Sequence, residues 1–138
     1  MKKAVITING LQALDDTDGV ELVTEGEYEY TPGRSEFRYT ESELTGLEGT
    51  DTDFVIEDGV VTMTRVGELT ATIVFDRSHK HYFVYNTPFG NITMGVETFS
   101  LSSELDEHGG NVEIIYVITI DNQTVSRNHF VMNIKVIK

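Results

Sequence analysis

Two charged residues stand in this sequence at positions where the surrounding pattern predicts apolar side chains. In the run VVTMTR, Arg65 follows Val61 and Met63 at a spacing of two, and in FRYTE, Glu41 follows Tyr39 in the same way. Successive side chains of a β-strand point to opposite faces, so each charge shares the face of its apolar neighbours. A guanidinium and a carboxylate that both face a protein interior could form an ion pair, or the guanidinium could bind the anionic group of a ligand.

Three readings of this pair remain open from the sequence. A buried charge without a partner costs several kcal/mol, so the first reading is a mutual ion pair that fixes strand register. The second is an anchor for a small acidic or amphipathic ligand, and in the third one or both charges lie near the rim in water. We name as candidate ligand-binding residues Arg65, Glu41, Tyr39, Tyr85 and Phe89.

His79 and His81 form the other pair of residues whose types and spacing are compatible with a chemical role. A spacing of two puts two imidazoles on the same face of a strand, as metal ligands require, and Asp76 is near in sequence. The segment DRSHKHY also has the composition of a polar loop that enters a strand, where solvated histidines are the commoner case. We therefore expect no metal site and no cofactor.

The motifs of common catalytic sites are absent from the sequence. The chain has no cysteine, which excludes disulfides, thiolate metal sites and a cysteine nucleophile. It has no G-x-S-x-G nucleophile elbow, no P-loop and no dinucleotide-binding glycine fingerprint. Paired carboxylates carry little information in a chain with 23 Asp and Glu residues. We expect that the protein is not an enzyme.

The charge balance argues against two classes of partner. Ten Lys and Arg against 23 Asp and Glu give a formal net charge of −13. Nucleic acids and anionic membrane surfaces both attract clustered cations, so we expect neither as a partner. The start, MKKAVITING, interrupts its apolar residues with polar Thr7 and Asn9, and no small-residue cleavage site follows. It predicts a first strand rather than a signal peptide, in a cytoplasmic protein.

Alternation of apolar and polar residues recurs from one end of the chain to the other. In VELVTEGEYEY, for example, Val20, Leu22 and Tyr28 share one face while glutamates occupy the other. Asp58-Gly59 is a strong hairpin signal between two such runs, and Asp121-Asn122 lies near the link between the last two. About ten strands joined by short turns predict an antiparallel sheet.

The predicted fold is all-β: a closed antiparallel up-and-down barrel of about 8–10 strands, formed by residues 1–138 as a single domain. A meander of this size must close or stack to protect its edges, and a two-sheet sandwich is the alternative. We expect little helix, confined to a turn or two such as Ser102–Gly110. In YNTPFG, Pro88 cannot sit in a central ladder and Gly90 permits an unusual φ, which predicts a turn or kink between strands.

Four segments support a family resemblance that spans nearly the whole chain in order. They are YTESELTGLEGT (Tyr39–Thr50), TRVGE (Thr64–Glu68), YNTPFG (Tyr85–Gly90) and GGNVEIIYVITI (Gly109–Ile120). With these segments the chain resembles the YwiB-like family of small bacterial β-barrel proteins with a lipocalin-like (calycin) fold. The resemblance implies a barrel and no catalytic residue, because the family has no assigned activity. Lipocalins proper bind small apolar molecules in the barrel mouth, but this chain lacks their Gly-x-Trp signature.

Two functions remain open from the sequence. The first is a non-catalytic barrel that binds a small molecule in its interior or at the mouth near Tyr85–Gly90. The second is a structural or protein-interaction barrel with a filled interior, with a homodimer as one form. Ile115 and Val117 place apolar groups on the strand face opposite Val112 and Ile114, so either another part of this chain or a second copy must cover them.

Overall fold

The computed structural model describes residues 1–12, 20–40, 49–67, 70–87 and 90–137. In this part of the chain there are ten β-strands and no helix. None of these residues belongs to a helix long and apolar enough to cross a membrane. The strands are β1 (Lys2–Gln12), β2 (Val20–Thr31), β3 (Arg34–Thr40), β4 (Asp51–Glu57), β5 (Val60–Val66), β6 (Ala71–Phe75), β7 (His81–Thr87), β8 (Gly90–Asp106), β9 (Gly109–Ile120) and β10 (Gln123–Val136).

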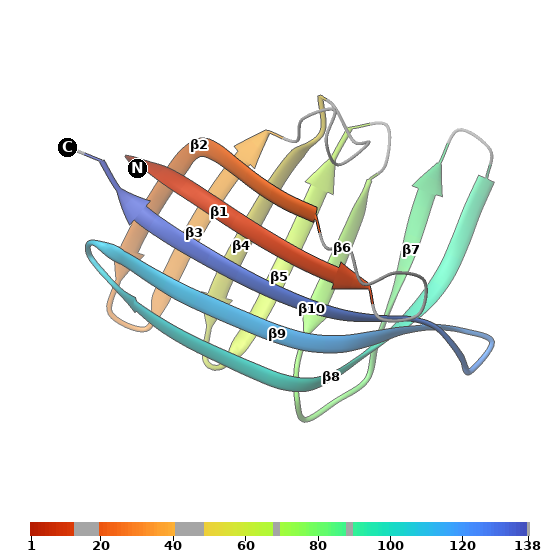
Figure 1. Cartoon of the computed structure of the whole chain (residues 1–138). Helices are drawn as coiled ribbons and strands as arrows, with labels where there is room; N and C mark the ends of the chain where they lie inside the picture. Colours follow the sequence, from red (N-terminus) through yellow and green to blue (C-terminus); the bar gives the residue numbers. More distant parts are fainter. Residues whose placement is uncertain (13–19, 41–48, 68–69, 88–89, 138) are drawn as a thin grey trace.

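The strands form one antiparallel sheet in the order β6-β5-β4-β3-β2-β1-β10-β9-β8-β7. Every neighbour in this order is also a neighbour in sequence except β1 and β10, which join the two ends of the chain. The sheet curls into a nearly closed barrel, with β6 and β7 on the two sides of its seam (Figure 1). The predicted up-and-down barrel is confirmed, and within the described residues the sheet order leaves β6 and β7 as its two ends.

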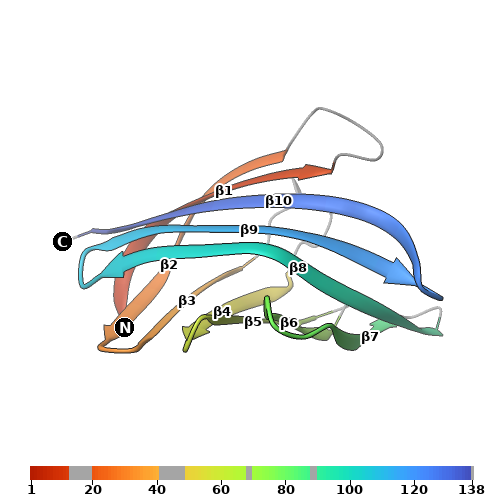
Figure 2. The ribbon, with the colours of Figure 1, turned by 90° about the horizontal axis from the view of Figure 1, so that it is seen from below.

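Two strands pass from one side of the barrel to the other. β2 pairs with β1 over Val20–Tyr28 and with β3 over Glu27–Thr31, so it turns a corner near Gly26. β8 likewise pairs with β7 along its first half and with β9 along its second. The barrel is therefore flattened, with β1, β10, β9 and the end of β8 on one side and β3 to β7 on the other (Figure 2).

The predicted turn residues adopt the required backbone conformation. Asp58 and Gly59 have φ values of 53° and 74°, and Asp121 and Asn122 have 52° and 65°. Positive φ at both central residues is the mark of a type I′ turn, whose twist matches that of the flanking strands. Thr87 pairs with Gly90, so the chain does reverse within YNTPFG, although residues 88–89 lie outside the described part.

The expected helical turn at Ser102–Gly110 is wrong. Here β8 continues to Asp106, and β9 begins at Gly109 after a two-residue turn. A Cβ at Gly110 would lie 1.8 Å from the carbonyl oxygen of Glu104, and Gly110 has a φ of 145°. The polar sequence around these glycines resembles a helical turn locally, but pairing with β9 and the close approach of the two backbones decide for a hairpin.

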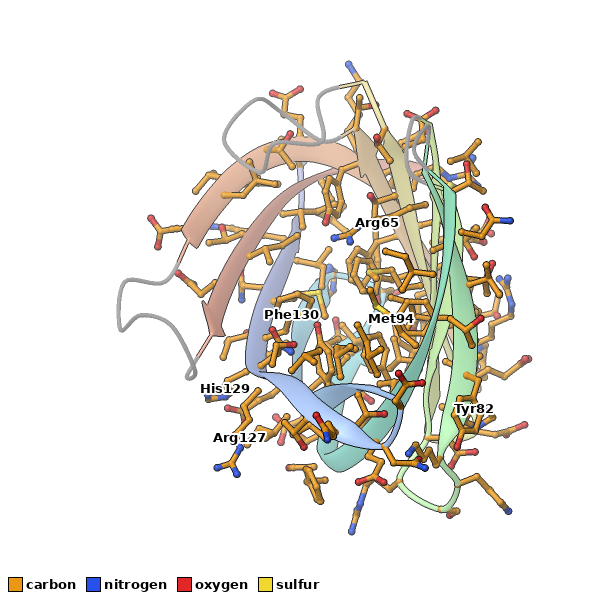
Figure 3. All side chains as sticks on the ribbon, turned by 90° about the vertical axis from the view of Figure 1, so that its right-hand side faces the viewer. Arg65, Tyr82, Met94, Arg127, His129 and Phe130 are labelled. Carbon is orange, nitrogen blue, oxygen red and sulfur yellow. The ribbon has the colours of Figure 1, made fainter. Side chains whose placement is uncertain are left out.

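Large side chains pack together in the described interior. The ring of Tyr116 on β9 lies 4.7 Å from that of Phe75 on β6 and 5.5 Å from that of Phe130 on β10, so it joins the two sides of the barrel. The rings of Phe37 and Phe54 stack at 4.9 Å on neighbouring strands. Figure 3 shows the crowding between the two sides. A core of this density follows from the inward positions of the alternating strands.

Candidate functional site

Arg65 lies on the inner face of β5, as its spacing from Val61 and Met63 predicts. It pairs with Thr52 on β4 and Ala71 on β6, and both of these residues are buried. The arginine itself is half-buried. Figure 3 shows its guanidinium between the two sides of the barrel rather than outside them.

Of the other predicted ligand-binding residues, Tyr39 lies in the same cross-strand row as Arg65, with Thr52 between them. Tyr39 is buried and pairs with Thr52, which pairs in turn with Arg65. Glu41 and Phe89 lie outside the described residues, so the Arg65–Glu41 ion pair stays a prediction. Tyr85 pairs with Ile92 through its backbone, and its side chain also lies outside the described part.

The two histidines of the H-x-H spacing both contact Asp76. Nδ1 of His79 lies 3.4 Å from Oδ2 of this carboxylate and Nε2 of His81 lies 3.1 Å from the same oxygen. The backbone N–H of Ser78 donates to Oδ1, and this bond, followed by the contacts with the histidines, lowers the pKa of Asp76. In the part of the chain that the structure describes, no three His, Asp or Glu side chains are arranged to hold a metal ion. The contacts instead tie the β6–β7 turn to the start of β7.

A hollow of about 710 Å³ opens on the outer surface where β2 separates from β3. β3 continues to pair with β4 as far as Thr40 and Asp51, whereas its pairing with β2 stops at Arg38. We call the space between the diverging strands the fork hollow. It is lined by Lys3, Glu25, Gly26, Glu27, Glu36, Arg38, Tyr39, Thr40, Asp51, Thr52, Asp53, Thr64 and Val66.

Gly26 makes the fork hollow sterically feasible. A Cβ at this position would lie 2.2 Å from the carbonyl oxygen of Arg38 and 2.6 Å from Cδ1 of Ile6. Real Cβ atoms do not approach a backbone oxygen so closely, so any other residue would push β2 away from β3 at this corner. Glycine therefore allows the strand to cross close to its neighbour just before the two separate.

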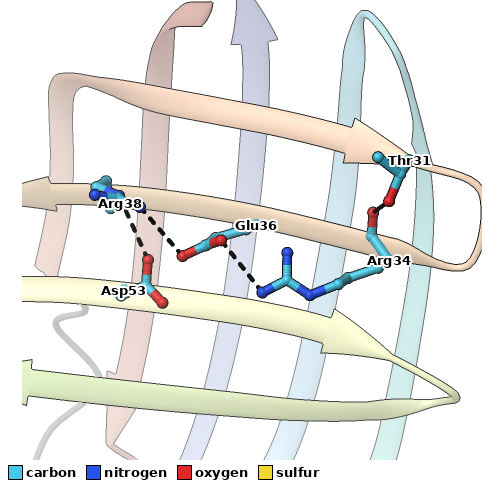
Figure 4. Close-up of polar contacts among 5 residues, drawn as sticks. All are labelled: Thr31, Arg34, Glu36, Arg38 and Asp53. Atoms are coloured by element: carbon cyan, nitrogen blue, oxygen red, sulfur yellow. Dashed lines mark hydrogen bonds and ion pairs between the residues drawn. The ribbon is translucent and has the colours of Figure 1, made fainter. Parts of the chain in front are cut away.

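The charged lining of the fork hollow is mostly acidic. Five carboxylates face only two cations, Lys3 and Arg38. Figure 4 shows how Glu36 accepts from two arginines: Nη2 of Arg34 lies 3.3 Å from its Oε1, and Nη2 of Arg38 lies 3.4 Å from its Oε2. Nε of Arg38 lies 3.7 Å from Oδ1 of Asp53, which is too far for a hydrogen bond.

Asp53 and Glu36 form a carboxyl pair that holds a proton. Oδ1 of Asp53 is buried and accepts no hydrogen bond from an N–H or hydroxyl group of the described residues. Burial, together with a hydrogen bond to Glu36 and the charge of Glu36, raises the pKa of Asp53 to about 6. The same bond lowers the pKa of Glu36, and Arg34 and Arg38 lower it further against the effect of burial. Asp53 is therefore the protonated member of the pair in mildly acidic solution.

Sequence reasoning missed this pair because it depends on cross-strand register. Glu36, Arg38 and Asp53 all occupy outward positions of their strands, and Arg38 pairs directly with Asp53. Alternation alone gives the outward direction of each residue but not which residue of β4 stands beside which residue of β3. That register could have been predicted only from knowledge of how residues 41–50 connect β3 to β4.

The family of the protein follows from its sequence and agrees with the fold. A family model described as "Domain of unknown function (DUF1934)" matches residues 6–132. The chain belongs to this family. The crystal structure of the ywiB protein from Bacillus subtilis is similar to this DUF1934 domain, with a TM-score of 0.87 over 99% of this chain and 93% of that chain. Its sequence identity is 19%, so the match shows the fold alone.

The resemblance to the YwiB-like family inferred from short motifs is thus confirmed. No protein with a curated description matches the sequence. The family description names no activity, and the fold by itself supports many functions. A function for this DUF1934 domain must therefore be inferred from its own hollow and its own surfaces.

Proposed function

We propose that the protein is a non-catalytic, lipocalin-like binding protein whose fork hollow holds a small molecule bearing an amine or another cationic group. The observation that carries the proposal is the buried Oδ1 of Asp53 in the wall of the hollow, which no N–H or hydroxyl group of the described residues reaches. A ligand N–H donor would satisfy this oxygen once a covering side chain such as Arg38, whose Nε lies 3.7 Å away, moves aside. A charge-assisted bond of this kind is also among the stronger ones available.

The electrostatics of the hollow favour a cation over an anion. Five carboxylates surround the space, and Arg38, one of its two cations, already contacts both Glu36 and Asp53. A ligand ammonium group would stabilise the ionised form of Asp53, which its surroundings disfavour. Below about pH 6, binding would therefore have to displace the proton that Asp53 and Glu36 share, whereas at higher pH the ligand would meet an ionised Asp53.

The size of the hollow suits a small molecule. Ligand sites in proteins occupy roughly 300–1,000 Å³, and the fork hollow has about 710 Å³. Val66, which is 58% exposed, adds apolar surface to the wall for the body of such a ligand. This site differs from the interior site predicted around Arg65, which does not line the fork hollow; an acidic ligand at Arg65 stays a prediction, as does a cytoplasmic location.

A thermal-shift screen with matched amines and carboxylic acids tests the proposal. We expect small amines to raise the melting temperature at about pH 7.5 and to lose most of this effect at about pH 5, where Asp53 holds its proton. Asp53→Asn should abolish the shift. Glu57→Gln is the matched control, since Glu57 is an exposed acid on the same strand that does not line the hollow.

Two results would contradict this function. One is a shift with carboxylic acids that equals or exceeds the shift with amines. The other is an Asp53→Asn variant that responds to amines as the wild type does. Recovery of the bound amine unchanged after long incubation is expected of a binding protein, and its conversion would show an enzyme instead.

A further inference from the structure

Two β-bulges flank β9, one in β8 opposite Ile115 and Tyr116 and one in β10 opposite Ile118 and Thr119. In β8 the register shifts between Thr98 and Ser100, which leaves Phe99 as an extra residue. In β10 it shifts between Thr124 and Ser126, which leaves Val125 as an extra residue. Both extra residues are apolar and exposed, Phe99 by 61% and Val125 by 45%. A bulge re-aims a side chain, and here both place apolar groups in solvent.

The bulges lie within a larger apolar area on the outer surface of β8 to β10, which curves round onto β7 where Gly95 and Val96 of β8 pair with both β7 and β9. Between them, Ile115 on β9 is 38% exposed, and on β7 Tyr82 is 63% exposed. Val117 lies on the same outer face of β9 but is buried, so neighbouring side chains of this chain cover it. The apolar outer face of β9 is therefore covered in part by the chain itself. We call this area the bulge patch; its residues are Tyr82, Phe99, Ile115, Val117 and Val125. Figure 3 shows Tyr82 directed away from the barrel interior.

The charge of the chain is concentrated away from this patch. Residues 1–75 contain 16 acidic and 5 basic residues, whereas residues 76–138, which form β7 to β10, contain 7 acidic and 5 basic ones. Two copies of a chain with a net charge of −13 repel each other over most of their surface. The face that carries the bulge patch is the one on which this repulsion is weakest.

We infer that the bulge patch is the interface of a homodimer, in which two copies meet about a two-fold axis. A two-fold interface uses the same surface on both copies, so that surface must be complementary to itself. On either side of Val117 the strands carry opposite charges, Glu97 on β8 and Arg127 on β10. Arg127 forms no ion pair with any residue that the structure describes, and Figure 3 shows it pointing outward. Across the axis, Arg127 of one copy would meet the acidic side of the other.

The size of the face is adequate for such a contact. Measured round the curve of the sheet, four strands about 4.8 Å apart, each giving about eight residues at about 3.3 Å, span about 500 Å². Two such surfaces would bury about 1,000 Å² in total, the lower end of the range for specific interfaces. The exposed aromatic residues Tyr82 and Phe99 are of the type enriched in such interfaces.

Sedimentation equilibrium, or light scattering after size exclusion, tests this interface on the full chain. We expect twice the monomer mass at micromolar concentrations and above. Phe99→Glu should shift the equilibrium to the monomer by at least tenfold, because each interface would then hold two buried carboxylates. Val23→Glu is the matched control: Val23 is an exposed valine of β2 in the acidic part of the chain, and its replacement should leave the dimer intact.

Circular dichroism and thermal unfolding should show that both variants fold, because both side chains are exposed. A charge reversal gives a second readout that does not depend on apolar contacts. Arg127→Glu alone should weaken the dimer, and Glu97→Lys in the same chain should restore part of the loss. A wild-type monomer throughout the concentration range would overturn the inference, as would equal effects of Phe99→Glu and Val23→Glu.

Discussion

The carboxyl groups of Glu36 and Asp53 are hydrogen-bonded to each other on the outer face of β3 and β4, so that one proton serves both. Two solvated acids on a strand surface would both ionise well below neutral pH. Here the hydrogen bond from Asp53, together with two arginines, lowers the pKa of Glu36, while burial keeps Asp53 protonated to about pH 6. The pair therefore sets the fork hollow apart from the many other acidic positions on this chain.

Replacing Asp53 by Asn should change how stability depends on pH. The pKa of Asp53 is about 6 in the folded protein and roughly 3.9 in an unfolded chain, so the folded state binds more protons between about pH 4 and 6. The stability that this group contributes is present below about pH 4 and is lost as the pH rises to about 6. Relative to wild type, Asp53→Asn should therefore gain stability across that window, as measured by urea unfolding at a series of pH values.

Glu57→Gln controls for the removal of one acid from the same strand, because it leaves the carboxyl pair intact. If the profile of Asp53→Asn departed from that of the wild type no more than the Glu57→Gln profile does, the carboxyl pair would not hold a proton in the way described. This measurement needs no ligand, so it separates the titration of the pair from the proposed binding function.

Replacing Gly26, at the corner of β2, should destabilise the protein more than replacing the turn glycine Gly59. Gly26→Ala places a Cβ 2.2 Å from a backbone oxygen, and the strands must separate to accept it, at a cost of about 2–3 kcal/mol in the free energy of unfolding. Gly59→Ala is the comparison: its φ is 74° but nothing lies within 4 Å of the added carbon, so about 1 kcal/mol is expected. Chemical denaturation measures both, and a smaller loss at Gly26 than at Gly59 would contradict the geometry of the fork.

The architecture of this protein was readable from local signals. Alternation gives the strand faces, and the positive φ values at Asp58-Gly59 and Asp121-Asn122 show that short turn motifs set two of the hairpins. Arg65 was placed on the inner face by the same argument. These features depend on residues close together in sequence, and a period of two has no other structural interpretation over so many segments.

The candidate site and the bulges could not be predicted in this way. The fork hollow exists because β2 leaves β3 after Arg38, and nothing in the alternation of either strand marks that point. Phe99 and Val125 shift the register of their strands by one residue, which a strict period-two reading assigns to the wrong face beyond the bulge. The helical turn predicted at Ser102–Gly110 was wrong for a related reason, because the pairing of β8 with β9 overrode the local composition.

Replacing Thr98 by valine should raise the stability of the protein, unlike the same change at most buried threonines. Its side chain is buried, and its Oγ1 has no hydrogen-bond partner among the described residues. Thr98→Val removes an unsatisfied hydroxyl at nearly constant volume, so we expect a gain of about 0.5–1 kcal/mol in the free energy of unfolding. Thr40→Val is the control, since Oγ1 of Thr40 donates to Oδ1 of Asp51 at 2.9 Å and its loss should slightly destabilise the fold. A destabilised Thr98→Val variant would reveal a partner for this hydroxyl.

Arg65 should contribute to stability from inside the barrel. It stands in a row with Thr52 and Tyr39 on the inner face, and its guanidinium lies between the two sides of the barrel. Arg65→Met keeps the length of the side chain but removes the charge and leaves its partner groups without a donor, which costs several kcal/mol when such groups are fully buried. Because Arg65 is half-buried, we expect about 1–2 kcal/mol.

A double-mutant cycle then tests the ion pair predicted from the sequence. Arg77→Met, which removes an exposed arginine in the β6–β7 turn, should change stability by less than about 0.5 kcal/mol and controls for the loss of one positive charge. If Glu41 is the partner of Arg65, Glu41→Gln and Arg65→Met should be non-additive by about 1 kcal/mol or more, because either change alone already breaks the pair. Additive effects on urea unfolding would show that Arg65 has a different partner, and a neutral Arg65→Met would contradict the inward placement of its charge.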